Sequence, residues 1–70
     1  MNRKPVDSSN IKAVGYDPES KTLEVEFQSG AVHAYEGVPA DKHAAFIKAK
    51  SAGGFFHTHI RGRFKGSRAE

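Results

Sequence analysis

The strict alternation of residues 22–28, TLEVEFQ, is the strongest constraint on the fold. In an extended strand, alternate side chains point to opposite faces, so one face of this segment is apolar and the other polar. The apolar side chains are Leu23, Val25 and Phe27. Ser29-Gly30 then supplies a tight hairpin turn, because glycine reaches positive φ without steric cost. Residues 31–36, AVHAYE, therefore return as a neighbouring strand.

A third strand precedes these two. Residues 11–16, IKAVGY, are rich in branched and aromatic side chains and end at the turn-forming sequence DPES. Three strands with short connections predict an antiparallel meander, in which one face is buried and the other is in water.

The period of the pattern changes at Val38-Pro39. Proline suits the first turn of a helix, because its missing N–H costs nothing there. Residues 40–51, ADKHAAFIKAKS, contain strong helix formers and predict one amphipathic helix. Ser51 is expected to cap a second short helix. Whether residues 52–60 form a regular helix stays open, because two glycines weaken this segment.

The apolar face of the sheet needs a cover, and four apolar side chains of the helical segments are suited to it: Phe46, Ile47, Phe56 and Ile60. The sequence therefore predicts an α+β fold. It consists of a three-stranded antiparallel meander, one amphipathic helix and a second short helix, with both helices packed on one sheet face.

A chain of 70 residues makes a single domain with one small core. We expect this domain at residues 8–64, between a flexible N-terminus (residues 1–7) and a flexible basic tail (residues 65–70). The absence of cysteine excludes disulfides and thiolate zinc sites. No apolar run is long enough to span a membrane, and the polar N-terminus lacks the apolar region of a signal peptide. We therefore expect a cytoplasmic protein without membrane association.

The net charge of +3 is unevenly distributed along the chain. Residues 1–40 carry a net charge of −2, and residues 41–70 carry +5. A one-sided basic field attracts phosphate backbones and other anionic surfaces. It also occurs on faces that only keep a small protein soluble.

The sequence has no motif of a catalytic or cofactor site: no Gly-rich phosphate loop with a lysine, no HExxH and no Gly-x-Ser-x-Gly. A structural zinc site needs four nitrogen or sulfur ligands, and only histidines are available here. They are His33, His43, His57 and His59. The first two occupy a strand position and a helix-face position, where packing explains them. We expect a protein that is not an enzyme and holds no cofactor and no metal.

The basic residues of the C-terminal half are the candidate nucleic-acid contacts, because arginine forks fit phosphate groups bidentately. These candidates are Lys48, Lys50, Arg61, Arg63, Lys65 and Arg68. RNA is the favoured partner, although another nucleic acid fits the same pattern. Tyr35 is a candidate for stacking on a base. The rings expected in the core instead are Phe27, Phe46 and Phe56.

The alternative function is a protein-interaction module with no nucleic-acid role, such as a homodimer. An open three-stranded sheet has two edges that invite pairing with another chain. The strand AVHAYE has no central lysine or proline to protect its edge. The sequence leaves both functions open.

From Ser8 to Phe64 the chain resembles the KTSC domain family. The resemblance rests on the order and spacing of five segments: SSNIKAVGYD, TLEVEFQSG, YEGVP, SAGG and FF-x-x-x-IRGRF. The family is named for its occurrence at the C-terminus of some lysyl-tRNA synthetases, which implies an RNA-related role by association. Single positions that match its pattern are Ser8, Ser9, Tyr16, Asp17, Gly30, Tyr35, Val38, Pro39, Ser51, Gly53, Phe56, Ile60 and Arg61.

The chain departs from this family pattern at three histidines. An aromatic residue such as tyrosine is common at the positions of His33 and His43, and asparagine is usual at the position of His57. Among the matching positions, Ser8, Ser9, Tyr16 and Asp17 are expected to hold turns by hydrogen bonds. The two serines alternatively border a binding surface.

Overall fold

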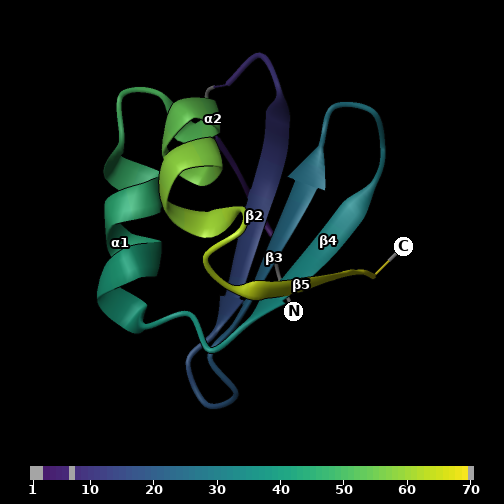
Figure 1. The fold of residues 1–70 in the computed structure, drawn as a ribbon. Helices are drawn as coiled ribbons and strands as arrows, with labels where there is room; N and C mark the ends of the chain where they lie inside the picture. The colour runs from purple at the N-terminus through teal and green to yellow at the C-terminus, as the bar shows by residue number, and fades with distance from the viewer. Residues whose placement is uncertain (1–2, 7, 70) are drawn as a thin grey trace.

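Five antiparallel strands form one sheet, and the helical elements pack on one side of it (Figure 1). The computed structural model describes residues 3–6 and 8–69. The strands lie in the sheet in sequence order: β1 (Lys4–Pro5), β2 (Ile11–Asp17), β3 (Thr22–Phe27), β4 (Val32–Glu36) and β5 (Lys65–Arg68). The helical elements connect β4 to β5: α1 (Ala40–Lys48), α2 (Ala52–Phe55) and a π-helical turn, η1 (Phe56–Ile60). Within the described residues, no helix is long and apolar enough to cross a membrane.

The predicted α+β class is confirmed, but the predicted number of strands is wrong. The meander gains one strand at each side, because β1 pairs with β2 and β5 pairs with β4. These strands lie in the segments that the sequence assigns to a flexible N-terminus and a flexible tail. Both consist entirely of exposed residues, and β1 has only 2 of them. Backbone pairing forms these strands, so they have no apolar pattern by which a sequence would indicate them.

The core lies between the sheet and the helical elements. Val14 is the cross-strand partner of Val25, and Leu23 is the partner of Tyr35, so three strands contribute side chains to this face. The buried cluster comprises Ile11, Val14, Leu23, Val25, Tyr35, Val38, Phe46, Ala52, Phe56 and Ile60. The inward orientation predicted for the alternating strand is confirmed, with Phe27 packed at the margin of the cluster.

α1 begins after Pro39, as predicted, and ends where Ala49 adopts an extended backbone. Phe46 is fully buried, whereas Ile47 is 50% exposed. The prediction that Ile47 covers the sheet is therefore wrong. Ile47 lies one position further round the helix than Phe46, and this turns it toward the β1 side of the sheet, beside a groove.

The second helical segment changes its winding partway along. Ser51 caps α2 as predicted, since its hydroxyl accepts a hydrogen bond from the Gly54 N–H at 3.1 Å. The following turn widens, and the Arg61 N–H donates to the Phe56 carbonyl five residues earlier, at 2.8 Å. This places Phe56 and Ile60 in the core, with 6% and 0% of their surface exposed. Their predicted role as a cover of the sheet is confirmed.

The strand AVHAYE is not an edge of the sheet. β5 covers β4, and the outermost strands are β1 and β5. Pro5 has no N–H to offer a partner strand, and β5 carries a charged residue at each end, Lys65 and Arg68. Proline and charge both disfavour pairing with another chain at an edge. The open edge that suggested a homodimer is therefore covered within the chain.

Tyr35 lies directly over Gly66, its cross-strand partner in β5. A Cβ atom at position 66 would lie 2.4 Å from Cε1 of the Tyr35 ring. The ring has little room to move, because it is 6% exposed and packs edge-to-face on Phe56, with 5.5 Å between ring centroids. Glycine at this position therefore allows β5 to pair closely with β4.

We expect Gly66→Ala to lower the free energy of unfolding by about 1–3 kcal/mol, because the new methyl group overlaps the Tyr35 ring. Urea denaturation followed by circular dichroism measures this change. Ser67→Ala is a matched control in the same strand, and it should alter the free energy by less than about 0.5 kcal/mol. Equal stability of the two variants would show that the fit between Tyr35 and Gly66 does not hold β5.

Candidate functional site

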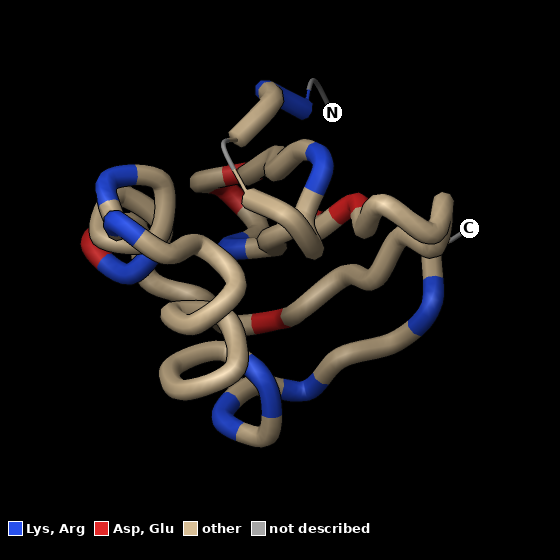
Figure 2. The backbone as a smooth tube through the Cα atoms, turned by 90° about the horizontal axis from the view of Figure 1, so that it is seen from above, with Lys and Arg blue, Asp and Glu red and all other residues tan. Residues whose placement is uncertain are grey.

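The basic residues proposed as phosphate contacts form two groups (Figure 2). Lys48 lies in the last turn of α1, and Lys50 lies in the link to α2. The second group follows η1, and we call residues 61–68 the basic segment. The basic residues of this segment are Arg61, Arg63, Lys65 and Arg68. Figure 2 shows the lysines near α1 set apart from the basic segment.

The sheet pairs several of its own charges. On β3, Glu24 lies 2.9 Å from Arg3 (Oε1 to Nη1), and Glu26 lies 3.6 Å from the same guanidinium group. Lys12 is 4.0 Å from Glu26. In contrast, the C-terminal half has five exposed cations with no ion pair to any described carboxylate: Lys48, Lys50, Arg61, Arg63 and Lys65. Lys4 and Lys21 of the N-terminal half share this property. The positive charge of the C-terminal half is therefore left for solvent or a partner.

The turn that carries Arg61 and Arg63 is held at both ends. The N–H groups of Arg63 and Phe64 donate to the Ile60 carbonyl at 3.0 and 3.2 Å. Ile60 is fully buried, and Phe64 packs against the core. Gly62 has φ of +77°, which glycine adopts at no steric cost. Both arginine side chains are thus presented on a backbone that is fixed by its neighbours.

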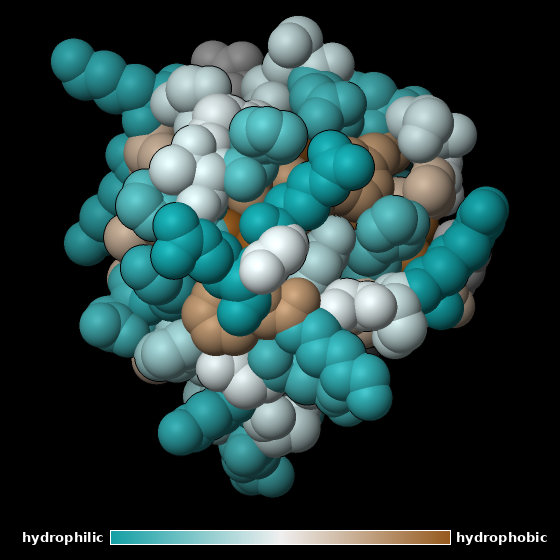
Figure 3. Space-filling model, in the orientation of Figure 1, coloured by the Kyte–Doolittle hydropathy of each residue, from teal (hydrophilic) through white to brown (hydrophobic). Residues whose placement is uncertain are grey.

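Figure 3 views the face of the molecule that Figure 1 shows, with β5 toward the viewer. This face is mostly hydrophilic, and its apolar surface is limited to small areas between polar side chains. A surface of this kind suits a charged partner better than an apolar one.

Tyr35 lies in the core, so its ring is not accessible for stacking on a base in this conformation. One ring packs on it from η1, that of Phe56, and the backbone of Gly66 lies beneath it. Burial raises the pKa of the Tyr35 hydroxyl, and the charge of Arg61 acts in the opposite direction. We therefore assign Tyr35 a structural role and leave it out of the candidate interface.

Tyr16 and His43 form a stacked pair between β2 and α1, which sequence reasoning did not predict. Their ring centroids are 4.5 Å apart, and the angle between the ring planes is 12°. The Tyr16 hydroxyl donates a hydrogen bond to the Val38 carbonyl just before α1. Burial lowers the pKa of the His43 imidazole, and the nearby Lys4 ammonium lowers it further. The helix-face position of His43, which already favoured a packing role, was the signal that this side chain lies against another element.

The turn-holding role predicted for Ser8 and Asp17 is confirmed. The Ser8 hydroxyl accepts hydrogen bonds from two backbone N–H groups that follow it, each at 3.2 Å. The Asp17 carboxylate accepts from the Ser20 hydroxyl at 3.0 Å and from the Glu19 N–H at 3.1 Å. The bond from Ser20, followed by that from Glu19, lowers the pKa of the Asp17 carboxyl.

The other histidines lie at separate places. The His33 ring packs edge-on against Phe27, with 5.3 Å between centroids, and the His59 ring lies 4.4 Å from that of Phe55. His57 is exposed on η1. Among residues 3–6 and 8–69, no three His, Cys, Asp or Glu side chains are grouped so that they can hold a metal ion.

The sequence of the whole domain matches a known family model. The model of the KTSC domain covers residues 7–64. The chain belongs to the KTSC domain family. The resemblance inferred from five short segments is thereby confirmed.

Two kinds of protein share this KTSC sequence. An uncharacterized protein of Stutzerimonas stutzeri (strain A1501) is 46% identical over 57 residues, which cover 81% of this chain and 80% of the relative. A lysine–tRNA ligase of Nostoc sp. is 41% identical over 59 residues, which cover 84% of this chain but 10% of the ligase. The matched region of the KTSC chain thus corresponds to four fifths of one relative and to one tenth of the other.

The KTSC fold is also similar to a solved structure. The crystal structure of a KTSC domain protein from Yersinia pestis has a TM-score of 0.95 and 39% sequence identity to this chain. The match covers 99% of this chain and 97% of the other. It therefore includes the strands at both ends of the sheet.

We expect Tyr16→Phe to lower the free energy of unfolding by about 1 kcal/mol, because the Val38 carbonyl loses its hydrogen-bond donor. Tyr35→Phe is the control, since the Tyr35 hydroxyl makes no side-chain hydrogen bond among the described residues. Thermal denaturation of both variants measures the difference. A similar loss in both would assign the effect to the polarity of the phenol and not to the bond with Val38.

Stability should also depend on the protonation of His43. Its pKa in the folded state lies below the ordinary value of 6.5, so the unfolded state binds the proton more readily. The contribution of the neutral imidazole is complete above pH 6.5 and is lost as the pH falls toward the lowered folded-state pKa. We expect His43→Phe, which keeps a stacking ring, to lose less stability than the wild type between about pH 7.5 and 5.5. His57→Gln serves as the exposed control, and it should follow the wild type. Parallel pH profiles for all three proteins would exclude His43 as the titrating group.

Proposed function

We propose that this KTSC chain is a non-catalytic module that binds RNA through its basic segment. The observation that carries the proposal is the anchored turn with Arg61 and Arg63. Both side chains are exposed, and neither has a carboxylate partner among the described residues.

Guanidinium groups suit this role for a physical reason. Each presents a planar set of N–H donors that matches two oxygens of a phosphate group. A fixed backbone at Arg61 and Arg63 lowers the conformational entropy lost on binding, because the turn is already held by Ile60 and Phe64. Lys65 extends the basic surface along β5, although Glu36 lies across from it in β4. The two arginines are therefore the main expected contacts.

The lysines near α1 supply a second set of charges. Lys48 and Lys50 are exposed and have no ion pair with a described carboxylate. An RNA strand that runs over the helical side of the molecule would meet them after leaving the basic segment. Contacts of this type read the phosphate backbone and carry little sequence information. We expect binding of modest affinity that weakens steeply with salt.

The relatives support RNA as the class of nucleic acid. Three of them are named lysine–tRNA ligase, and in each the matched region makes up 10% of the protein. An enzyme of that name acts on a tRNA, so an attached basic module has an RNA within reach. This support is an analogy, because it rests on the kind of protein in which the domain occurs.

The test is a titration of the protein with a single-stranded RNA, an RNA hairpin and a duplex DNA of equal charge, followed by fluorescence anisotropy at several salt concentrations. Replacing both Arg61 and Arg63 by glutamine should weaken RNA binding and reduce the slope of log K against log salt by about 1.4, at about 0.7 for each lost phosphate contact on a single strand. A preference for either RNA over the duplex supports an RNA-binding module.

The control keeps the net charge of the double variant. Lys12→Gln combined with Lys21→Gln also removes two positive charges, on β2 and on the turn that follows it. This control should bind RNA nearly as the wild type does. Equal losses in the two double variants would reduce the effect to net charge. If the wild type binds none of the three ligands at low salt, the proposal is wrong, and a protein partner becomes the better explanation of the basic surface.

A further inference from the structure

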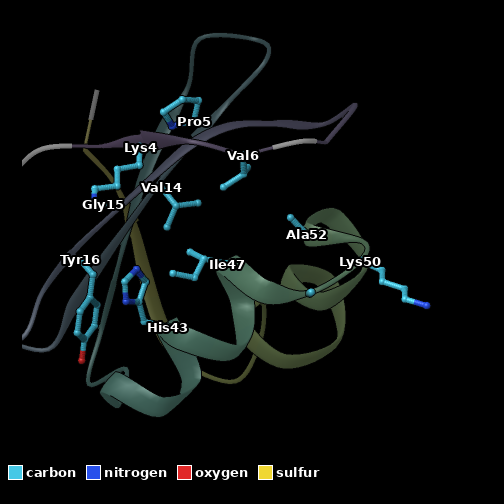
Figure 4. A pocket seen from close by; sticks show the side chains of 11 residues that line it. Lys4, Pro5, Val6, Val14, Gly15, Tyr16, His43, Ile47, Lys50 and Ala52 are labelled. Atoms are coloured by element: carbon cyan, nitrogen blue, oxygen red, sulfur yellow. The ribbon is translucent and has the colours of Figure 1, made fainter.

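A groove lies beside α1, on the part of the sheet that the helical elements leave uncovered (Figure 4). Its volume is about 620 Å³. Strands β1 and β2 and the residue after β1 form one wall, from which Pro5, Val6 and Val14 line the groove. The opposite wall is α1, with His43 and Ile47. A space of this size accommodates a small organic molecule.

The middle of the groove is apolar. Ile47 is the large hydrophobic side chain that stands out among the described residues, because half of its surface is exposed. It lies across from Val6 and Val14 in Figure 4. Val6 is only partly buried at the edge of the core, and Ala52 lines the far end. An apolar ligand between these side chains would remove exposed surface on both walls from water.

One end of the groove is polar and positively charged. Tyr16, His43 and Lys4 lie together there (Figure 4). Burial and then the charge of Lys4 lower the pKa of the His43 imidazole, and both side chains line the groove. The described lining residues include two lysines and no carboxylate. The second, Lys50, has its side chain directed away from the groove in Figure 4, whereas the Lys4 side chain lies at the Tyr16 end, beside Gly15.

We propose that this groove binds a small organic monocarboxylate with an apolar acyl or aryl body. The carboxylate accepts hydrogen bonds from the Lys4 ammonium and from an N–H of His43. The apolar body lies against Val6, Val14 and Ile47. A single ammonium beside a neutral ring balances one negative charge, whereas a phosphate dianion would leave a second charge without a cation. The site is separate from the basic segment and does not depend on the proposed RNA binding.

The test uses 4-phenylbutyrate as the probe and amide spectra of the ¹⁵N-labelled protein as the readout. We expect saturable shifts that are largest around Val6, Val14–Tyr16 and His43–Lys50. For a ligand with about a dozen heavy atoms, the dissociation constant should lie in the millimolar range. The neutral analogue 4-phenylbutyramide should bind about fivefold more weakly, because it cannot pair with the ammonium group. Phenyl phosphate should also bind more weakly than the carboxylate.

Two variants test the two halves of the site. Lys4→Gln removes the charge and Ile47→Ser removes apolar surface, and each should weaken binding about fivefold. Both residues are exposed, so the fold should persist, and melting curves check this. Lys12→Gln is the matched control, because Lys12 approaches Glu26 instead of lining the groove. Replacing Arg61 and Arg63 by glutamine should leave binding unchanged.

Three outcomes would overturn the proposal. Absence of shifts up to about 10 mM probe would show that the groove takes no such ligand. Shifts concentrated on the basic segment would show general attraction of anions. Equal affinity for the carboxylate and the amide would show that Lys4 and His43 do not recognise the charge.

Discussion

The ring of Phe56 contacts an aromatic ring on each layer of the molecule. Its centroid lies 5.3 Å from that of Phe27 on β3, 5.5 Å from Tyr35 on β4 and 6.4 Å from Phe46 on α1. A chain of 70 residues has room for one core, so the positions of its elements depend on a few large side chains. The π-helical turn η1 directs Phe56 inward. The Tyr35 ring packs on Phe56 on one side and against Gly66 of β5 on the other. Helix winding, sheet width and the placement of the basic segment are thereby coupled through one ring.

The parts of the fold that the sequence predicted depend on local signals. Alternation identified β3, and Pro39 and Ser51 marked where α1 and α2 begin. The outer strands β1 and β5 have no such signal, because they are exposed on both faces and form only when a neighbour is present. Ile47 was misplaced for a related reason. Helical spacing gives the angle between two side chains of a helix, but not how far the sheet beneath that helix extends.

The sequence was sufficient to predict which residues give the candidate site its charge, but not how these residues are arranged in space. A sequence shows which half of the chain is basic, but it does not show that Glu24 and Glu26 pair with Arg3, or that Ile60 and Phe64 fix the turn with Arg61 and Arg63. Tyr35 fits a core position and a base-stacking position equally well by sequence, and the presence of β5 decides between them. The groove depends on side chains that are distant in sequence, such as Lys4 and His43, and on space left between elements.

β5 also bears on where a KTSC domain ends. The family model stops at residue 64, and β5 begins at Lys65. A fragment that ends at residue 64 would lack β5. The β5-facing edge of β4 would then have no partner strand, and the Tyr35 ring would lose its contact with Gly66. The 4 residues that follow the pattern have a structural task that any residues with a suitable backbone can perform, provided that a glycine lies beneath the ring. In this chain, the segment just beyond the family pattern therefore belongs to the sheet and is not a linker.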